Sequence, residues 1–298
     1  MKIVVRQMSG LGNQLFQYAA GAYYSTRYRV PLTIAADPDR HASSGGSPRP
    51  FQLSMFRIQA QMRPASWLEQ VLLTQHAARR KVAARLRRLL GAKLFIEPDP
   101  YHFYPDLPWR DGRVIYLRAY WQAAGYAAAV ESRLREEFVL KTEPSGKNLE
   151  TLNRIAASRC PVSVHIRRGD YKGTGHDLTL PMSFYEKAIA VLRDRLTSPE
   201  LFVFSDDIEY ARQNLSRDLK IHFVDHNNEF TAYEDLRLMG ACRHHVIANS
   251  SFSWWGAWLT PRSDKLVLAP KHWRGQVVSY YPDLYPAGWE LIDNLLPE

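Results

Sequence analysis

The most regular hydrophobic pattern lies in the second half of the chain. Short apolar runs rich in β-branched and aromatic residues occur there at 161–166, 201–205, 221–224, 244–248 and 265–269. The stretches between them, at 181–196, 208–215, 231–242 and 252–259, carry apolar residues at helical spacing. Strands that alternate with helices form right-handed βαβ units, and such units build a parallel sheet with helices on both faces. The pattern therefore predicts a parallel, doubly wound α/β domain, in which ligands bind beyond the carboxyl ends of the strands.

The first half of the chain shows fewer clear strands and is expected to be less regular. We predict strands at 2–8, 31–36 and 114–120 and helices at 13–28 and 126–138. Leu15, Phe16 and Tyr18 are expected in the core. The segment 141–148, KTEPSGKN, is rich in turn residues and predicts a linker between domains 1–145 and 146–298. Two α/β domains joined at that point predict a cleft between them.

Length and composition agree with two domains of ordinary size. The chain has 298 residues, of which 46% are hydrophobic, and this is enough apolar material for two cores. Cys160 and Cys242 are too few for a disulfide framework, so we predict buried, reduced thiols. The start of the chain has no signal-peptide pattern, and no run approaches the roughly 20 apolar residues of a membrane span. These features predict a cytoplasmic protein.

The net charge of +9 comes mostly from residues 76–93. This segment holds seven Arg and Lys residues and no acid, and without these seven cations the net charge falls to +2. Its residues Val82, Leu86, Leu89 and Leu90 recur at helical spacing, which predicts a basic amphipathic helix. In one interpretation the apolar stripe packs on the core. In the other, the helix contacts anionic lipid headgroups or a lipid-linked acceptor. No zinc spacing, RNA-binding sheet motif or helix-turn-helix signature supports a nucleic-acid partner.

The stretch HIRRGDY, from His165 to Tyr171, places Arg167 and Arg168 at the carboxyl end of a predicted buried strand. An arginine there can make bidentate hydrogen bonds to phosphate oxygens, and it stays charged at any relevant pH. Gly169 permits a tight turn, and Asp170 can orient an arginine. The alternative is a purely structural ion pair between an arginine and Asp170.

Polar side chains also follow two neighbouring strands. Asp206 and Asp207 can accept hydrogen bonds from a guanine edge or a ribose, although helix capping is the alternative. Asn249, Ser250 and Ser251 stand between a strand and a helix, where hydroxyl and amide groups favour a phosphate, and capping is again the alternative. Together with the arginines, these groups predict a sugar-nucleotide site.

The N-terminal stretch SGLGNQLFQYAAG places a glycine turn before a helix that begins near Asn13. It is not a dinucleotide fingerprint, because G-x-G-x-x-G is absent, and it is not a Walker loop, because no Gly-Lys-Ser/Thr follows. The turn is predicted to bring the amides of Asn13 and Gln14 to the cleft.

Three of these blocks resemble the signatures of the α-1,2-fucosyltransferases, glycosyltransferase family 11. GLGNQLFQYA, HIRRGDY and NSSFSWWGAWL lie between residues 10 and 259, and HIRRGDY matches H-x-R-R-G-D-Y in full. Ser9 departs from the second glycine that many members have. The resemblance implies a GT-B-like fold with two Rossmann-like domains facing a cleft. The first domain would be on the acceptor side, and the second would bind GDP-fucose.

The resemblance also implies a reaction and a set of residues. The reaction is inverting transfer of L-fucose from GDP-fucose to O2 of a terminal galactose, on a β-galactoside such as a lactose-type or O-antigen glycan. Arg167 is implied at the β-phosphate and Asn13 at the reacting centre, with Gln14 and His176 also on the acceptor side. The implied donor-binding residues are His165, Arg167, Arg168, Asp206, Asp207, Ser250, Ser251 and Phe252.

An arginine at the β-phosphate would make a metal unnecessary, because it stabilises the charge that develops as the bond to fucose breaks. We therefore expect no metal and no cofactor, although Asp37 and Asp39 match the D-x-D pattern of metal-dependent transferases. Asp177 is the candidate for the base that activates the acceptor hydroxyl. Asp170 is expected to be structural.

Two alternatives stay open. One is a related glycosyltransferase with another nucleotide-sugar donor or linkage. The other is a non-catalytic protein that binds a glycan or a nucleotide sugar. The intact arginine motif argues against the second, because a lectin needs no phosphate clamp.

Overall fold

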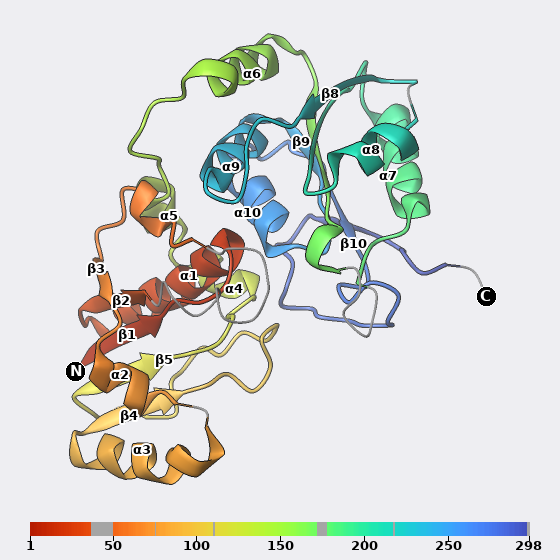
Figure 1. Cartoon of the computed structure of the whole chain (residues 1–298). Helices are drawn as coiled ribbons and strands as arrows, with labels where there is room; N and C mark the ends of the chain where they lie inside the picture. Colours follow the sequence, from red (N-terminus) through yellow and green to blue (C-terminus); the bar gives the residue numbers. More distant parts are fainter. Residues whose placement is uncertain (37–49, 75, 110, 172–177, 217, 297–298) are drawn as a thin grey trace. The chain divides into compact units, whose positions relative to one another are not determined.

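The computed structural model describes the chain except for residues 37–49, 75, 110, 172–177, 217 and 297–298 (Figure 1). The chain forms two compact α/β units. The N-terminal unit contains Met1–Lys141 and Pro282–Pro286, and the C-terminal unit contains Thr142–Tyr281 and Ala287–Glu298. The first boundary thus falls after Lys141, inside the segment that the sequence marked as a linker, and helix α6 (Gly146–Ala157) begins within that segment.

The N-terminal unit is built on a five-stranded sheet in the order β3-β2-β1-β5-β4, with every neighbouring pair parallel. Its central strand carries Ile3, Val4 and Val5, all fully buried. The expectation of a less regular first half is wrong, because the sheet also contains β3 and β4. Both lie at the edges and are short and partly exposed, so neither has a clear apolar run. The strands are β1 (Lys2–Arg6), β2 (Leu32–Ala36), β3 (Gln61–Pro64), β4 (Ala92–Phe95) and β5 (Val114–Leu117).

Helix α1 supplies much of the core of this unit. Leu15, Phe16 and Tyr18 are fully buried, as the pattern predicts. The helix predicted at 126–138 is instead two short helices that meet at Val130. The helical segments of the unit are α1 (Leu11–Tyr28), η2 (Leu53–Met55), α2 (Trp67–Leu72), α3 (Ala77–Leu89), α4 (Ala124–Ala129) and α5 (Glu131–Glu137).

Helix α3 forms where the basic segment predicts it. Its apolar stripe packs on the core only in part, because Leu86 contacts a core cluster whereas other residues of the stripe are exposed. Val82 and Leu89 are 59% and 80% exposed, whereas Ala83 is fully buried and Leu86 is partly buried. The reason is the place of the helix, which contacts the edge strand β4 and the short helix α2 (Figure 1). Its contact face passes through Ala83 and Leu86, and this leaves one side of the apolar stripe in solvent.

The C-terminal unit confirms the predicted parallel, doubly wound sheet. Its six strands lie in the order β11-β10-β9-β6-β7-β8, and every neighbouring pair is parallel. Leu201 and Val203 of β7 belong to one core cluster, whereas Phe202 and Phe204 belong to another. Because alternate residues of a strand point to opposite faces, both faces of this sheet are covered.

The first part of this unit comprises α6, β6 (Pro161–Ile166), η3 (Gly169–Tyr171), α7 (Met182–Arg195), β7 (Glu200–Ser205) and α8 (Ile208–Asn214). The second part comprises β8 (Lys220–Val224), α9 (Ala232–Ala241), β9 (His244–Val246), α10 (Ser251–Leu259), β10 (Val267–Pro270) and β11 (Glu290–Ile292). The pattern predicts all of these strands except β11.

Both cysteines are buried and free, which confirms the predicted thiols. Burial raises the pKa of the Cys242 thiol far above its usual range. In the described part of the chain, no helix has the length and apolar character needed to cross a membrane.

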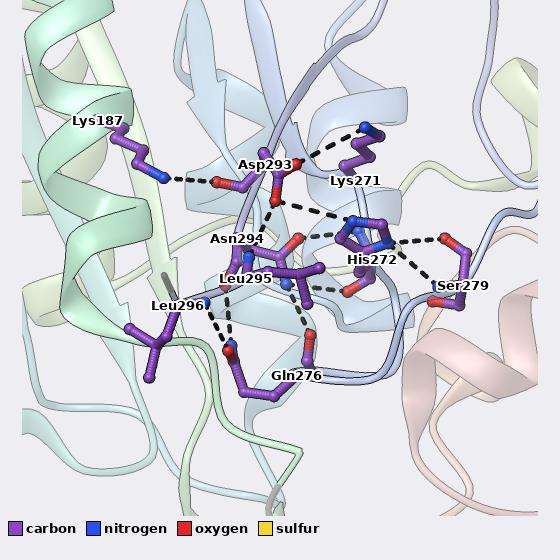
Figure 2. A network of polar contacts seen from close by, with 10 residues as sticks. Lys187, Lys271, His272, Gln276, Ser279, Asp293, Asn294, Leu295 and Leu296 are labelled. Carbon is purple, nitrogen blue, oxygen red and sulfur yellow. Dashed lines mark hydrogen bonds and ion pairs between the residues drawn. The ribbon is translucent and has the colours of Figure 1, made fainter. Parts of the chain in front are cut away.

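Buried polar contacts fix the loop after β10 to the C-terminal segment (Figure 2). Asn294 accepts a hydrogen bond from the His272 N–H at 2.8 Å and donates to the Gly275 carbonyl at 2.8 Å. The Ser279 N–H donates to Nδ1 of His272 at 3.1 Å. This loop leaves the carboxyl end of β10, which is the edge where the sequence predicts the donor site.

Candidate active site

A single carboxylate holds the arginine turn at the end of β6, the strand between β9 and β7. Asp206, which follows β7, accepts hydrogen bonds from the backbone N–H groups of Arg168 at 2.9 Å and Gly169 at 3.0 Å. Its Oδ2 also lies 3.0 Å from Nη1 of Arg167, whose side chain keeps 20% of its surface exposed. The guanidinium of Arg167 is therefore oriented before any ligand arrives.

The same turn requires a glycine. A Cβ atom added to Gly169 would lie 2.8 Å from Oδ2 of Asp206, which is closer than real side chains approach. The glycine of HIRRGDY is thus required by its packing against Asp206.

The second arginine packs against α8. Nε of Arg168 lies 3.3 Å from Oδ2 of Asp207, and its guanidinium carbon lies 3.3 Å from the centre of the Tyr210 ring. Oδ1 of Asp207 accepts from the Tyr210 N–H at 3.3 Å and caps the helix. The capping alternative for Asp207 is therefore what the structure shows, and a contact of this carboxylate with the donor stays a prediction.

His165 is a buried, neutral imidazole next to this turn. Burial, together with the charge of Arg167, lowers the pKa of His165 to about 3. Its Nδ1 is buried and has no hydrogen-bond partner within the described part of the chain. The ring centre lies 5.8 Å from that of Phe252, at the start of α10. A neutral imidazole can donate or accept a hydrogen bond without adding charge to the site.

Asn249 connects three loops at this edge of the sheet. Its amide nitrogen donates to the carbonyls of Leu178 at 2.9 Å and Trp273 at 3.0 Å. Its own carbonyl accepts from the hydroxyl of Tyr171, the last residue of HIRRGDY, at 2.9 Å. No role was predicted for Tyr171 or Trp273 from the sequence. Tyr171 could have been found from its position in the HIRRGDY motif, whereas no feature of the sequence pointed to Trp273.

The hydroxyl of Ser250 caps α10 by accepting a hydrogen bond from the Phe252 N–H at 3.3 Å. Capping was the alternative for this residue, and it is observed. Ser251 and Phe252 form the first turn of α10 and are both partly exposed. The structure thus brings all eight predicted donor-binding residues to the carboxyl edge of one sheet.

Asn13 and Gln14 lie at the carboxyl edge of the other sheet, in the first turn of α1. Nδ2 of Asn13 donates to the Ser9 hydroxyl at 3.0 Å, and its Oδ1 accepts from Nε2 of Gln122 at 2.5 Å. The buried amide of Gln14 donates to the carbonyls of Ser9 and Pro50, both at 2.9 Å. Gln14 therefore fastens two loops, and its acceptor-side role stays a prediction. Gln122 was not among the predicted site residues.

The backbone conformation at Ser9 is one that favours glycine, the residue that resembling sequences often have at this position. Its φ is +68°, in the left-handed region that glycine adopts without strain. In this chain the Ser9 hydroxyl accepts the amide of Asn13, so the side chain takes part in the turn.

Several predicted residues cannot be placed. His176, Asp177, Asp37 and Asp39 lie outside the described residues, and so does the side chain of Asp170. Among the side chains that are described, no group of three or more His, Cys, Asp or Glu is arranged to hold a metal ion.

The family model for glycosyl transferase family 11 matches residues 73–293. The chain belongs to this family. It is therefore a glycosyltransferase, and its fold is GT-B-like. The same fold appears in the crystal structures of fucosyltransferase NodZ from Bradyrhizobium, including NodZ soaked with GDP-fucose. That likeness has a TM-score of 0.53 at 13% identity and covers 87% of this chain and 93% of NodZ.

Three curated relatives are similar in sequence. The O-antigen biosynthesis glycosyltransferase WbnK of Escherichia coli is 29% identical and covers 89% of this chain and 92% of its own. The α-1,2-colitosyltransferase of Escherichia coli is 31% identical over 98% and 99% of the two chains. The galactoside 2-α-L-fucosyltransferase Sec1 of Mus musculus is 32% identical over 33% of this chain and 28% of its own.

Proposed function

We propose that this family 11 glycosyltransferase transfers L-fucose from GDP-fucose to O2 of a terminal galactose with inversion of configuration. The observation that carries the proposal is the guanidinium of Arg167, oriented by Asp206 at the carboxyl end of a central strand. The name of the mouse relative supports fucose as the sugar and O2 of galactose as the position that receives it. NodZ is an α-1,6-fucosyltransferase, and its soak with GDP-fucose supports this donor but not this linkage. WbnK supports a glycan of the O-antigen type as acceptor.

In this reaction O2 of galactose attacks C1 of fucose, and the bond from C1 to the GDP oxygen breaks. Negative charge then develops on the β-phosphate, where Arg167 stabilises it without further reorganisation. Asp177 would take the proton of the attacking hydroxyl. Because the arginine supplies the positive charge, we propose that the reaction needs no metal ion.

Transfer of radiolabelled fucose from GDP-fucose to lactose in the presence of EDTA tests this proposal. Arg167→Ala should lower kcat roughly 100- to 1,000-fold, as the loss of one preorganised donor does elsewhere. Arg167→Lys should recover part of that activity. Arg195→Ala removes an exposed ion pair with Glu290 and serves as the matched control. A folded Arg167→Ala variant that keeps its activity would show that this arginine is not the phosphate clamp.

A second donor is favoured by the α-1,2-colitosyltransferase, whose likeness extends over nearly the whole chain. Colitose is fucose without its 3-hydroxyl group, so one pocket can accept both sugars. Measuring kcat/KM for GDP-fucose and GDP-colitose in parallel decides between them. A clear preference for GDP-colitose would replace the proposed donor and leave the role of Arg167 unchanged.

We also propose that α2 and α3 contact an anionic membrane. Val82 and Leu89 are seven residues apart, about two helical turns, and so lie on one side of α3. The exposed cations of this helix are Arg79, Arg80, Lys81, Arg85 and Arg88. On the adjoining α2, Trp67 is 76% exposed. Exposed apolar side chains flanked by cations suit the interface of an anionic bilayer.

Among the residues that the structure describes, no acidic side chain of α2 or α3 neutralises these cations. The acid of α2, Glu69, is buried and paired with Arg63 at 2.6 Å, and residues 76–93 contain no acid. Each cation near an anionic leaflet contributes about 1 kcal/mol of binding.

Co-sedimentation with phosphatidylcholine vesicles, with and without phosphatidylglycerol, tests the membrane proposal. We expect binding only to the anionic vesicles, and weaker binding at high salt. The double variant Val82→Ser/Leu89→Ser should lose most of it, whereas Val278→Ser/Tyr280→Ser, which removes exposed apolar residues elsewhere, should not. If the first variant binds as well as wild type, Val82 and Leu89 do not contribute to binding, and the proposed membrane contact through this side of α3 is wrong.

A further inference from the structure

A buried glutamate lies at the same edge of the N-terminal sheet as Asn13. Glu97 stands just beyond β4 and is 6% exposed. Its Oε1 accepts hydrogen bonds from the backbone N–H groups of Tyr120 at 2.7 Å and Trp121 at 2.6 Å. Both residues lie in the loop beyond β5. Because β4 and β5 are parallel neighbours, the two loops leave the sheet side by side.

The loop that Glu97 holds has an unfavourable backbone conformation. The φ of Trp121 is +58°, a left-handed value that is rare for a bulky residue and costs roughly 1–3 kcal/mol. The indole is fully buried and packs against the rings of Tyr24, Phe95 and Tyr126. The two hydrogen bonds to Glu97 and this packing together keep the turn in place.

The next residue transmits the position of the turn to Asn13. The Gln122 N–H donates to the carbonyl of Pro100 at 2.7 Å, and its Nε2 donates to Oδ1 of Asn13 at 2.5 Å. Within the same turn, Tyr120 is 40% exposed and therefore open to a ligand. A chain of contacts thus runs from Glu97 through residues 120–122 to the family signature that contains Asn13.

The other carboxyl oxygen of Glu97 argues against a purely structural tie. Oε2 is buried and has no hydrogen-bond partner among the residues that the structure describes. An orphan polar atom of this kind costs about 1–3 kcal/mol. Such a retained cost is typical of a functional site.

We propose that Glu97 is a positioning residue for the acceptor sugar: it fixes the turn of residues 120–122 and, through Gln122, sets the orientation of the Asn13 amide toward the hydroxyl that reacts. Tyr120 and Asn13 then form a subsite for the terminal hexose of the acceptor. This inference rests on the proposed function, which puts Asn13 at the reacting centre.

Steady-state kinetics with lactose and GDP-fucose varied separately test the proposal. Glu97→Ala should lower kcat/KM for lactose by roughly 10- to 100-fold, because small misplacements of a positioning group have effects of this size. The KM for GDP-fucose should not change. Glu97→Gln keeps the acceptor oxygen and should restore most of the activity. Glu131→Gln, which alters an exposed glutamate of α5, is the control.

A second variant covers the case in which Glu97→Ala does not fold. Gln122→Ala leaves the Glu97 hydrogen bonds intact and removes only the contact to Asn13, so it should raise the KM for lactose in a protein of unchanged Tm. Equal changes in the donor and acceptor parameters, or none in either variant, would overturn the inference. If wild type transfers sugar from neither GDP-fucose nor GDP-colitose, the proposed function itself fails and the inference falls with it.

Discussion

At the residue scale, Asp206 holds the arginine turn at the carboxyl end of β6, because its carboxylate binds two backbone N–H groups and the guanidinium of Arg167. Gly169→Ala should therefore disturb the arginine turn, since the added Cβ would meet Oδ2 of Asp206 at 2.8 Å. We expect weaker GDP binding, by about tenfold or more, with a modest loss of stability from overpacking. Calorimetric titration of GDP checks this expectation. Wild-type affinity in Gly169→Ala would mean that the turn can move without affecting the donor site.

Glu97 should also make the stability of the protein depend on pH. Burial raises the pKa of Glu97 in the folded state from 4.5 to about 8, and the charge of Asp99 adds to the rise. The charge of Glu97 in turn acts on the nearby titratable side chain of Tyr126. The folded state then keeps a proton that the unfolded state has lost. The free energy of unfolding that Glu97 contributes is therefore greatest below about pH 4.5. It falls as pH rises toward about 8, by at most about 1.4 kcal/mol for each pH unit.

Urea unfolding of wild type and Glu97→Gln across this pH range measures the effect. The difference between the two proteins should fall steadily with rising pH up to about 8 and then level off. A constant difference would show that Glu97 is already ionised in the folded protein at neutral pH.

At the element scale, α9 and α10 approach closely because Gly256 has no side chain. A Cβ atom at Gly256 would lie 2.9 Å from both Cβ and Sδ of Met239, whereas one at Gly240 would meet Cβ of Leu259 at an ordinary 3.4 Å. Gly256→Ala should lower the free energy of unfolding by about 1–3 kcal/mol, and Gly240→Ala should have a much smaller effect. Thermal unfolding of the pair provides the comparison. Equal values of Tm would mean that the helices separate at no cost.

At the scale of the whole molecule, the segment Pro282–Pro286 returns to the N-terminal unit although it lies near the end of the chain. Oδ2 of Asp283 accepts the Phe103 N–H at 3.0 Å and lies 2.8 Å from Nδ1 of His102, and its carbonyl accepts the Ala124 N–H at 2.7 Å. Leu284 is fully buried beside it. The N-terminal unit therefore depends on a segment that follows most of the C-terminal unit in sequence.

Asp283→Ala should weaken the N-terminal unit alone. We expect faster hydrogen exchange around Phe103 and Ala124, with unchanged protection of β6 and β7, because the lost contacts are all in the first unit. Asp264→Ala, which breaks exposed ion pairs of the C-terminal unit, is the control. Faster exchange in both units would show that they unfold as one body.

The sequence alone determined those features that rest on local patterns. Alternating apolar runs and helical stretches specified the parallel sheet of the C-terminal unit, because strand burial on both faces leaves continuous apolar segments. The same pattern predicted that the donor-binding residues lie together, since parallel strands end at one edge of the sheet. The signature blocks marked the family. The placement of Asp206 on the arginine turn was not predicted, because the sequence offered Asp170 as the nearer partner.

Only the tertiary structure decided the features that depend on distant neighbours. The edge strands β3 and β4 are short and half exposed, so their pairing rather than their composition defines them. The apolar stripe of α3 looks like a core face in sequence, yet the helix lies against a sheet edge that covers only part of it. The contacts of Glu97 with residues 120–122 join two loops that are distant in sequence, and no local pattern records them. Periodicity reports which residues can be buried, whereas the packing of the elements decides which of them are.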